Sequence, residues 1–293
     1  MKMNIKVTDV REHPGDAAFL LDDGKTAVLF DTGFGFTGFA IAEKVKKALN
    51  GRNLDYIFLT HSHYDHALGA PYVKSYWPEA RVVAGEYATR IFAKDSAKAL
   101  MRKLDREFAT TCGVGEYEDL IDGLGVDVPV ADGDTVTAGD MVFTVVALPG
   151  HTKCSVGFYL ASEKLLLACE TLGVYDGEKT IMPSYLVGVQ MALDSIEKAK
   201  TLDIEYILAP HFGILNAEQS AYYLENMAKS ARETAEEIVA ILKRGGSKDE
   251  AFRHYEKKFY HGKIKEGYPR GAMELNAGII INLIEREFLT PAE

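Results

Sequence analysis

The sequence has few cysteines, no long hydrophobic run and no excess of basic residues. Its 293 residues include only three cysteines, Cys112, Cys154 and Cys169, and their spacing fits neither a disulfide framework nor a Cys-x-x-Cys metal site. No apolar stretch approaches the roughly 18 residues that cross a bilayer. The first seven residues lack the hydrophobic core of a signal peptide. We therefore expect a cytoplasmic protein that is neither disulfide-stabilised nor inserted in a membrane.

The charge balance argues against nucleic acid as a partner. The formal net charge is −10, whereas proteins that bind a phosphate backbone concentrate lysine and arginine. With 26 glycines and 9 prolines the chain has no room for a long low-complexity tract, and 47% of its residues are hydrophobic. These values are typical of a globular protein, and we expect a small-molecule substrate. A homodimer stays an open alternative.

Strand-like runs alternate with turns over the first 216 residues. Residues 17–21 and 27–30 flank the turn Asp22-Asp23-Gly24-Lys25 and predict a hairpin. Residues 38–49 and 86–121 are predicted to be helical, the second as a charged insertion beside the core. The further strands are expected at residues 54–60, 141–148, 155–160, 164–168 and 206–208. Two strand-rich halves of this kind indicate two similar layers.

The character of the chain changes at Ala217. Residues 217–243 form a long helical pattern that ends at Gly245-Gly246, and the segment from Ser247 to Glu250 predicts a capping box that opens a second helix. A third helix is expected over residues 273–288. We therefore divide the chain into a catalytic domain, residues 1–216, and a helical cap packed on it, residues 217–293.

Five of the eight histidines follow directly after a predicted strand. They are His61, His63, His66, His151 and His211. Because strand ends at one edge of a sheet converge, we expect these loops to meet. The spacing of His61 and His63 lets two imidazoles of an extended segment reach one point, and a third ligand from another loop would leave a position open for water. Asp65 and His66 are available for a second ion.

The alternative is a cluster of histidines that only cap loops. A chance match to the pattern H-x-H-x-D-H in a chain of this length and composition is on the order of one in a few thousand. The metal interpretation is therefore favoured for this set. His254 and His261 lie alone in the helical tail and are expected to be ordinary surface or packing residues.

Three motifs together resemble the metallo-β-lactamase-fold hydrolases. They occur in that family's order within about residues 15–215 and are Phe30-Asp31-Thr32-Gly33, Thr60-His61-Ser62-His63-Tyr64-Asp65-His66 and Leu148-Pro149-Gly150-His151-Thr152. The resemblance implies an α/β protein of the α+β kind, a four-layer αββα sandwich of two mixed β-sheets with a helical insertion and a helical C-terminal extension. It also implies a dinuclear metal site at one edge of the sheets.

The resemblance assigns a role to each ligand. The first metal would be bound by His61, His63 and His151, and the second by Asp65, His66 and His211. Glu170 stands where the family usually has a bridging aspartate. Zn²⁺ is the expected ion at both positions, with Fe²⁺ or Mn²⁺ as alternatives. Asp31 either orients a ligand histidine or only begins a turn, and we favour the orienting role.

The implied reaction is hydrolysis of a small ester, thioester or lactone by a metal-bound hydroxide, because a divalent ion lowers the pKa of bound water toward about 7. Asp65 would also orient the nucleophile. Tyr175 and Tyr185 are candidate proton donors or oxyanion stabilisers, with loop packing as their alternative role. The rival functions are a phosphodiesterase or nuclease of the same fold, a mononuclear iron oxidoreductase of the persulfide dioxygenase kind, and a metal-containing ligand-binding protein with little turnover.

Overall fold

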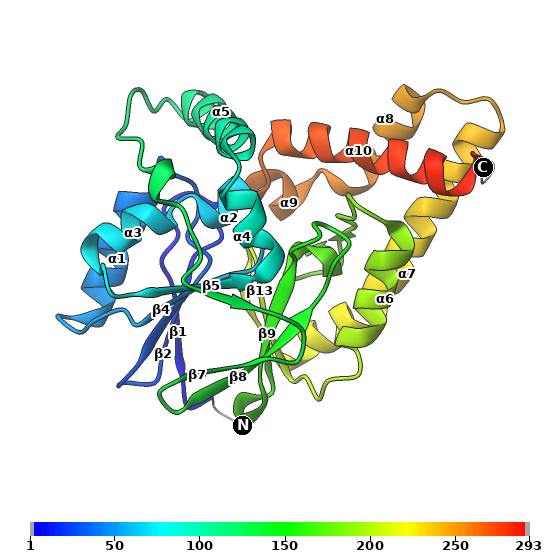
Figure 1. Ribbon diagram of the computed structural model, residues 1–293. Helices are drawn as coiled ribbons and strands as arrows, with labels where there is room; N and C mark the ends of the chain where they lie inside the picture. Colours follow the sequence, from blue (N-terminus) through cyan, green and yellow to red (C-terminus); the bar gives the residue numbers. More distant parts are fainter. Residues whose placement is uncertain (1–2, 291–293) are drawn as a thin grey trace.

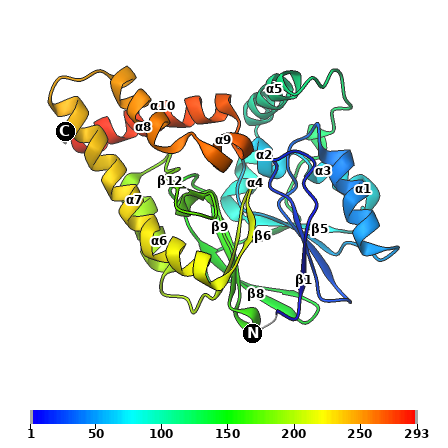
Figure 2. The same ribbon diagram turned by 180° about the vertical axis from the view of Figure 1, so that it is seen from behind.

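Two six-stranded sheets pack against each other in the computed structural model, which describes residues 3–290 (Figure 1; Figure 2). Helices cover the outer face of each sheet, so the order of the layers is helix, sheet, sheet, helix. This arrangement confirms the predicted αββα sandwich.

The first sheet follows the chain order from β1 to β6. Its first three strands are antiparallel and the remaining pairings are parallel. Parallel neighbours need a crossover connection, and each one here carries helices, such as α1 (Gly38–Leu49) after β3 and α3 (Ala70–Tyr76) after β4. The strands are β1 (Lys6–Asp9), β2 (Phe19–Asp22), β3 (Ala27–Phe30), β4 (Tyr56–Leu59), β5 (Arg81–Gly85) and β6 (Val128–Val130).

The second sheet has the order β14-β13-β10-β9-β8-β7. Only β10 and β13 are parallel, and the helix α6 (Val189–Ala199) lies between them in the chain. The strands are β7 (Thr135–Ala138), β8 (Met141–Ala147), β9 (Val156–Leu160), β10 (Leu165–Leu167), β13 (Tyr206–Ala209) and β14 (Gly213–Leu215), and a separate small hairpin is formed by β11 (Val174–Tyr175) and β12 (Ile181–Met182). Both large sheets are mixed, as predicted.

Alternating side chains let each sheet bury both of its faces. In β4, Phe58 lies between the two sheets, whereas Ile57 and Leu59 pack under the helices. In β10, Leu166 packs toward the helices on the other side. The rings of Phe58 and Phe158 stack across the interface with their centroids 4.5 Å apart. Strands buried on both faces have nearly continuous apolar sequences, which explains why these segments were readily predicted.

The predicted insertion at residues 86–121 forms two helices, α4 (Glu86–Phe92) and α5 (Asp95–Thr111), whereas residues 112–120 are not helical and lead to the one-turn helix η1 (Ile121–Gly123). Buried Asp105 fastens α5 to the loop after β3. Its carboxylate accepts hydrogen bonds from the backbone N–H of Gly35 at 2.9 Å and from the hydroxyl of Tyr117. The insertion is therefore held at a fixed distance from the sheet edge.

The C-terminal cap consists of helices that share a buried apolar cluster with α6 and the second sheet. They are α7 (Ala217–Lys243), α8 (Lys248–Phe259), α9 (Gly262–Gly267) and α10 (Arg270–Phe288). Asn216 caps α7 and Ser247 caps α8, each accepting from a backbone N–H three residues ahead. The short α9 was not predicted, and α10 begins at Arg270 rather than Met273. Within residues 3–290, no helix is long and apolar enough to span a membrane.

Removing the ring of Phe58 is expected to destabilise the sandwich. Phe58 is fully buried and also contacts Phe143 edge-on, with the ring centroids 5.0 Å apart. Because Phe58→Ala leaves a cavity between the sheets, the free energy of unfolding should fall by about 3–5 kcal/mol, as measured by urea denaturation. Val142→Ala shortens an exposed side chain of β8 and should change the free energy of unfolding by less than about 0.5 kcal/mol. Equal losses for both variants would contradict this packing.

Candidate metal centre

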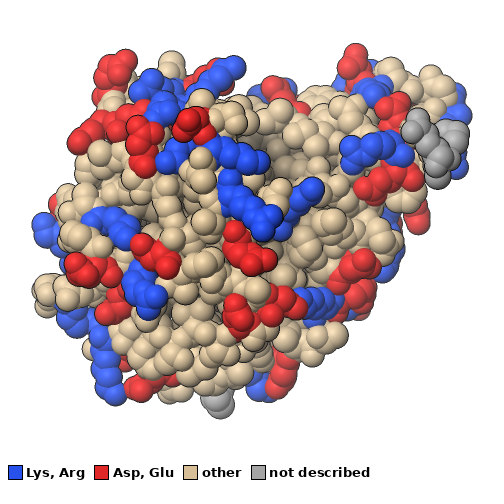
Figure 3. Space-filling model, in the orientation of Figure 1, with Lys and Arg blue, Asp and Glu red and all other residues tan. Residues whose placement is uncertain are grey.

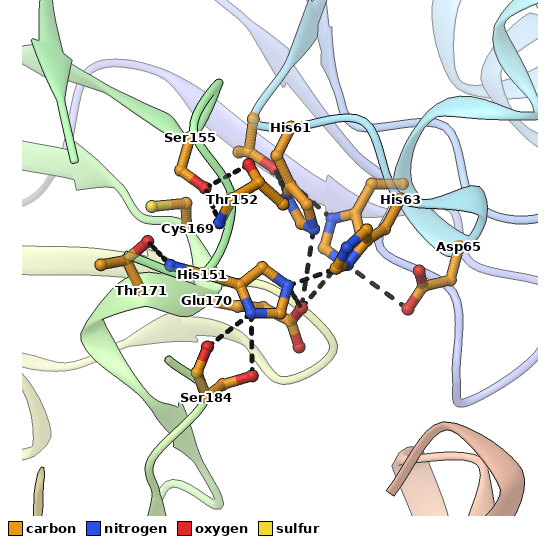
Figure 4. Close-up of polar contacts among 12 residues, drawn as sticks. His61, His63, Asp65, His151, Thr152, Ser155, Cys169, Glu170, Thr171 and Ser184 are labelled. Carbon is orange, nitrogen blue, oxygen red and sulfur yellow. Dashed lines mark hydrogen bonds and ion pairs between the residues drawn. The ribbon is translucent and has the colours of Figure 1, made fainter. Parts of the chain in front are cut away.

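The loops that follow β4, β8, β10 and β13 meet at one edge of the two sheets (Figure 4). They bring together all seven side chains that the sequence predicted as ligands. In two groups, one ligand atom per residue lies within 4.8 Å of the others, and these groups are His61, His63, His151 and Glu170, and Asp65, His66 and His211. Four of the seven residues come from a single segment after β4, which ends in the one-turn helix α2 (Tyr64–Ala67).

Glu170 belongs to the first group and also reaches the second. Its Oε2 is 2.7 Å from Nε2 of His151 and 3.6 Å from Nε2 of His61. The same oxygen is 3.7 Å from Nε2 of His66, and Oε1 is 3.5 Å from Nε2 of His211. The carboxylate therefore reaches both groups, which is the position that the resemblance assigned to the bridging ligand.

Asp31 organises the start of the ligand segment. It follows β3 in a left-handed conformation, with φ of 53°, and is fully buried. Its carboxylate accepts from the backbone N–H of Thr60 at 2.8 Å and lies 2.8 Å from Nδ1 of His66. A hydrogen bond at Nδ1 fixes the ring so that Nε2 is directed to the cluster, 3.7 Å from Asp65. This geometry is that of the orienting role predicted for Asp31.

His151 is held by polar groups on both sides. Its backbone N–H donates to the hydroxyl of Thr171 at 3.1 Å, and its ring Nδ1 lies 2.6 Å from the carbonyl oxygen of Ser184. The preceding Gly150 has φ of 142°, and a Cβ there would lie 2.7 Å from Cα of Ala192. Only glycine fits at that position, and the loop consequently turns His151 Nε2 toward Glu170 (Figure 4).

Several buried ligand atoms have no hydrogen-bond partner among the described residues. They are Nε2 of His61, Nε2 of His66, Oε1 of Glu170 and both ring nitrogens of His211. Buried polar atoms are normally paired, because leaving them unpaired costs roughly 1–3 kcal/mol each. Bound cations would satisfy the Nε2 atoms and the Glu170 oxygen, and imidazole and carboxylate ligands suit Zn²⁺, Fe²⁺ or Mn²⁺. The residues present therefore fit divalent metal ions.

The electrostatics of the cluster also favour a cation. Burial, together with the neighbouring imidazoles, lowers the pKa of His61 well below its ordinary value, so the ring is neutral. Burial opposes ionisation of Glu170, but the surrounding imidazoles hold its pKa well below its usual range. Burial lowers the pKa of His66 too, yet Asp65 and Asp31 outweigh it and raise that pKa to about 9. Protons and metal ions compete for His66 Nε2, and acid should weaken metal binding.

A cavity of about 450 Å³ lies over the cluster, between α5 and the N-terminal part of α10. His63, Asp65 and Glu170 line one end of it. The remaining wall comes from the insertion, through residues such as Leu104 and Phe108, and from the cap. The ligand groups are thus accessible from a space that could hold a small molecule.

Tyr175 and Tyr185 lie outside this cavity. The hydroxyl of Tyr175 donates to the carbonyl oxygen of Glu178 at 2.9 Å, and its ring stacks on that of Tyr223. The hydroxyl of Tyr185 faces the carbonyl oxygen of Ala231 at 3.4 Å, and the side chain is fully buried. The structure brings neither tyrosine to the ligands. The contacts of both residues are those of packing, which was their alternative role.

Tyr268 is a cavity residue that the sequence did not indicate. It follows α9, is buried, and its ring lies edge-on to that of His211 with a centroid distance of 5.9 Å. Asn276, on α10, donates from Nδ2 to the Tyr268 hydroxyl at 2.7 Å, and both residues line the cavity. A single residue in a turn produces no periodic signal, and no motif surrounds it.

Comparison with known proteins identifies the family. The sequence model of the metallo-beta-lactamase superfamily matches residues 15–211 of the chain. The chain belongs to the metallo-β-lactamase superfamily. Among curated proteins, this member of the superfamily is similar to a hydroxyacylglutathione hydrolase from Bradyrhizobium sp. (strain ORS 278), with 26% identity over 54% of the chain and 48% of that protein. It is also similar to the acyl-coenzyme A thioesterase MBLAC2 of Gallus gallus, with 24% identity over 55% of the chain and 57% of that protein.

Solved structures of the superfamily share the fold over most of the chain. A metallo-beta-lactamase family protein from Thermus thermophilus superposes with a TM-score of 0.63 at 21% identity, covering 94% of this chain and 90% of that one. The B3 metallo-beta-lactamase BLEG-1 superposes with a TM-score of 0.54 at 20% identity, covering 73% and 96%. At these identities the likeness shows the fold alone. The chain spans only about half the length of the two curated relatives above.

Weakening the hydrogen bond between Asp31 and His66 should weaken metal binding. Asp31→Asn keeps a residue that tolerates the left-handed conformation but removes the carboxylate charge. We expect Zn²⁺ affinity, measured by chelator competition, to fall about 10- to 100-fold. The matched variant Asp140→Asn changes an exposed carboxylate and should bind Zn²⁺ like the unmodified protein. Unchanged affinity in Asp31→Asn would show that Asp31 does not support the site.

Proposed function

We propose that this protein is a metal-dependent hydrolase that acts on a small ester, thioester or lactone. The observation that supports this most strongly is the cluster of metal-ligand side chains, several with unpaired buried atoms, at the end of a cavity. Two divalent ions, with Zn²⁺ expected, would be held by His61, His63 and His151 and by Asp65, His66 and His211, with Glu170 shared between them. Such ions lower the pKa of a water molecule and polarise a carbonyl group.

Asp65 has the position of a ligand that also orients the nucleophile. It lines the cavity, and its Oδ2 lies 3.7 Å from Nε2 of His66 and 3.9 Å from Nε2 of His211. The second carboxylate oxygen can accept a hydrogen bond from a water molecule beside the substrate. Asp65 would therefore fix the direction of attack as well as contribute to the site.

Tyr268 is suited to donate a hydrogen bond to the substrate. Its hydroxyl oxygen already accepts from Asn276, which leaves the proton free to be donated. Burial and the nearby carboxylates of Glu170 and Asp65 raise the pKa of Tyr268 well above its ordinary value, so the hydroxyl keeps this proton. A carbonyl or leaving-group atom in the cavity would be its acceptor, which is the role first predicted for Tyr175 and Tyr185.

The relatives favour a thioester within this substrate class. Two of them bear the names hydroxyacylglutathione hydrolase and acyl-coenzyme A thioesterase. A thiolate leaves without a proton donor, whereas an alkoxide needs one. A thioester substrate would therefore need no general acid from the cavity wall.

A phosphodiesterase is less well supported. The cavity contains one basic side chain, Arg270, and its guanidinium is already engaged by Glu256 at 3.0 Å and Glu274 at 2.7 Å. A phosphate group would find no unpaired cation among the residues that line the cavity. A neutral carbonyl compound needs none.

Asp65→Ala should abolish hydrolysis. We expect kcat/KM for a phenyl thioester to fall at least 100-fold, because the variant loses both a ligand and the group that orients water. Asp140→Ala, which removes an exposed carboxylate that does not line the cavity, should stay within about threefold of the unmodified protein. Rates on a thioester, a lactone and a phosphodiester, with metal content from mass spectrometry, test the proposal. A variant that lost no hydrolysis, or that retained persulfide oxidation, would contradict it.

Tyr268→Phe should lower kcat about 10- to 100-fold, because one donor to the developing negative charge is lost. Zn²⁺ content and KM should change little, which separates this effect from damage to the site. Tyr222→Phe removes a hydroxyl elsewhere in the cap, where it donates to the carbonyl oxygen of Lys179, and should leave kcat unchanged. Equal kcat values for the two variants would remove Tyr268 from the reaction.

A further inference from the structure

We infer that the cavity between α5 and α10 receives a neutral, apolar acyl group, so that the substrate is an aliphatic or aromatic acyl ester or thioester. This inference rests on the proposed hydrolase function and specifies what that site cleaves. It is carried by the lining of the cavity, by the charges around it and by the way the cavity ends at the metal ligands.

The wall of the cavity is mainly apolar along its length. Leu104 and Phe108 lie one turn apart on α5, and Ala272 and Leu275 lie on the opposing first turns of α10. Pro269, just before α10, adds to the same wall. Apolar walls with a few convergent polar groups at one end are typical of sites that bind small apolar molecules. Here the polar end is the ligand cluster, which would take the carbonyl group while the acyl chain extends between the helices.

The charges of the cavity disfavour an anionic acyl group. Arg270 is engaged by two glutamates, and Glu107 is the other charged residue of the wall that is not a proposed metal ligand. A second carboxylate at the far end of the acyl chain would therefore meet the like charge of Glu107 and no unpaired cation of the wall. Lys, Arg, Asp and Glu side chains are interspersed over this face of the molecule (Figure 3), so a charged carrier would be accommodated outside the cavity more easily than within it.

Leu275 supplies an apolar surface that the protein itself does not cover. Half of its surface, 50%, is exposed although it lines the cavity. An acyl chain lying against Leu275 and Phe108 would bury this surface, and each methylene group placed there would strengthen binding by about threefold to fourfold. The preference for longer chains should therefore depend on Leu275.

The test is the rate of hydrolysis of phenyl thioesters by the Zn²⁺-loaded protein. The acetyl, butanoyl and hexanoyl thioesters form a length series, and the glutaryl thioester has a chain of similar length to hexanoyl that ends in a carboxylate. We expect kcat/KM to rise roughly 80- to 250-fold over the four methylene groups from acetyl to hexanoyl and the glutaryl thioester to be at least 20-fold poorer than hexanoyl.

Two variants of α10 locate the effect. Leu275→Lys should lower kcat/KM for the hexanoyl thioester about tenfold, leave the acetyl value within twofold and improve the glutaryl value. Ile279→Lys, the matched control, changes an exposed side chain one turn further along α10 that does not line the cavity, and should leave the series unchanged.

The outcomes separate the inference from the function on which it rests. Equal rates for acetyl and hexanoyl, a preference for glutaryl, or equal effects of the two variants would overturn the apolar acyl site while hydrolysis itself stands. No hydrolysis of any member of the series would overturn the proposed function, and this inference with it.

Discussion

The imidazole and carboxylate groups of the ligand loops lose their hydration when the protein folds and buries them at the edge of the two sheets. The rest of the site depends on what replaces the lost water. The outer nitrogens of two rings are bound to protein groups, His66 to Asp31 and His151 to Ser184. The Nε2 atoms of His61, His66 and His211 have no hydrogen-bond partner in the described part of the chain. Divalent cations can replace the lost water at these atoms. The side chains are therefore arranged to bind metal, which distinguishes the cluster from a loop that is only rich in histidine.

The sandwich and the cavity have different tasks. The sheets fix the positions of the ligand loops, because Phe58, Phe158 and their neighbours pack the two layers against each other. The cavity wall comes from α5 and α10, which lie outside the sandwich. Changes in these helices can alter the substrate without moving a ligand, since loops and added elements on a rigid scaffold are where specificity resides. The superfamily likeness therefore informs the chemistry more than the substrate.

Local signals accounted for much of the fold. The buried strands β4, β9 and β10 are nearly continuous apolar runs, and α7 begins at the residue where its helical pattern placed it. The short α9 gave no such signal, because a helix of six residues completes too few turns to show a period. The choice between the two roles of Tyr175 and Tyr185 could not be read from the sequence for a related reason. Both residues follow Glu170 closely in the chain, but nearness in sequence did not show that their hydroxyls turn to backbone carbonyls.

The ligand types and their order were determined by the sequence alone, because His61-x-His63-x-Asp65-His66 places four donors in one short segment and the remaining three each follow a strand of their own. Tertiary structure decided the rest. Pairing of β10 with β13 brings Glu170 within 3.5 Å of His211, packing of the two sheets brings it within 3.7 Å of His66, and only the cap places Tyr268 and Leu275 over the site. The physical reason is that ligand chemistry belongs to individual side chains, whereas a cavity is formed by surfaces far apart in the chain.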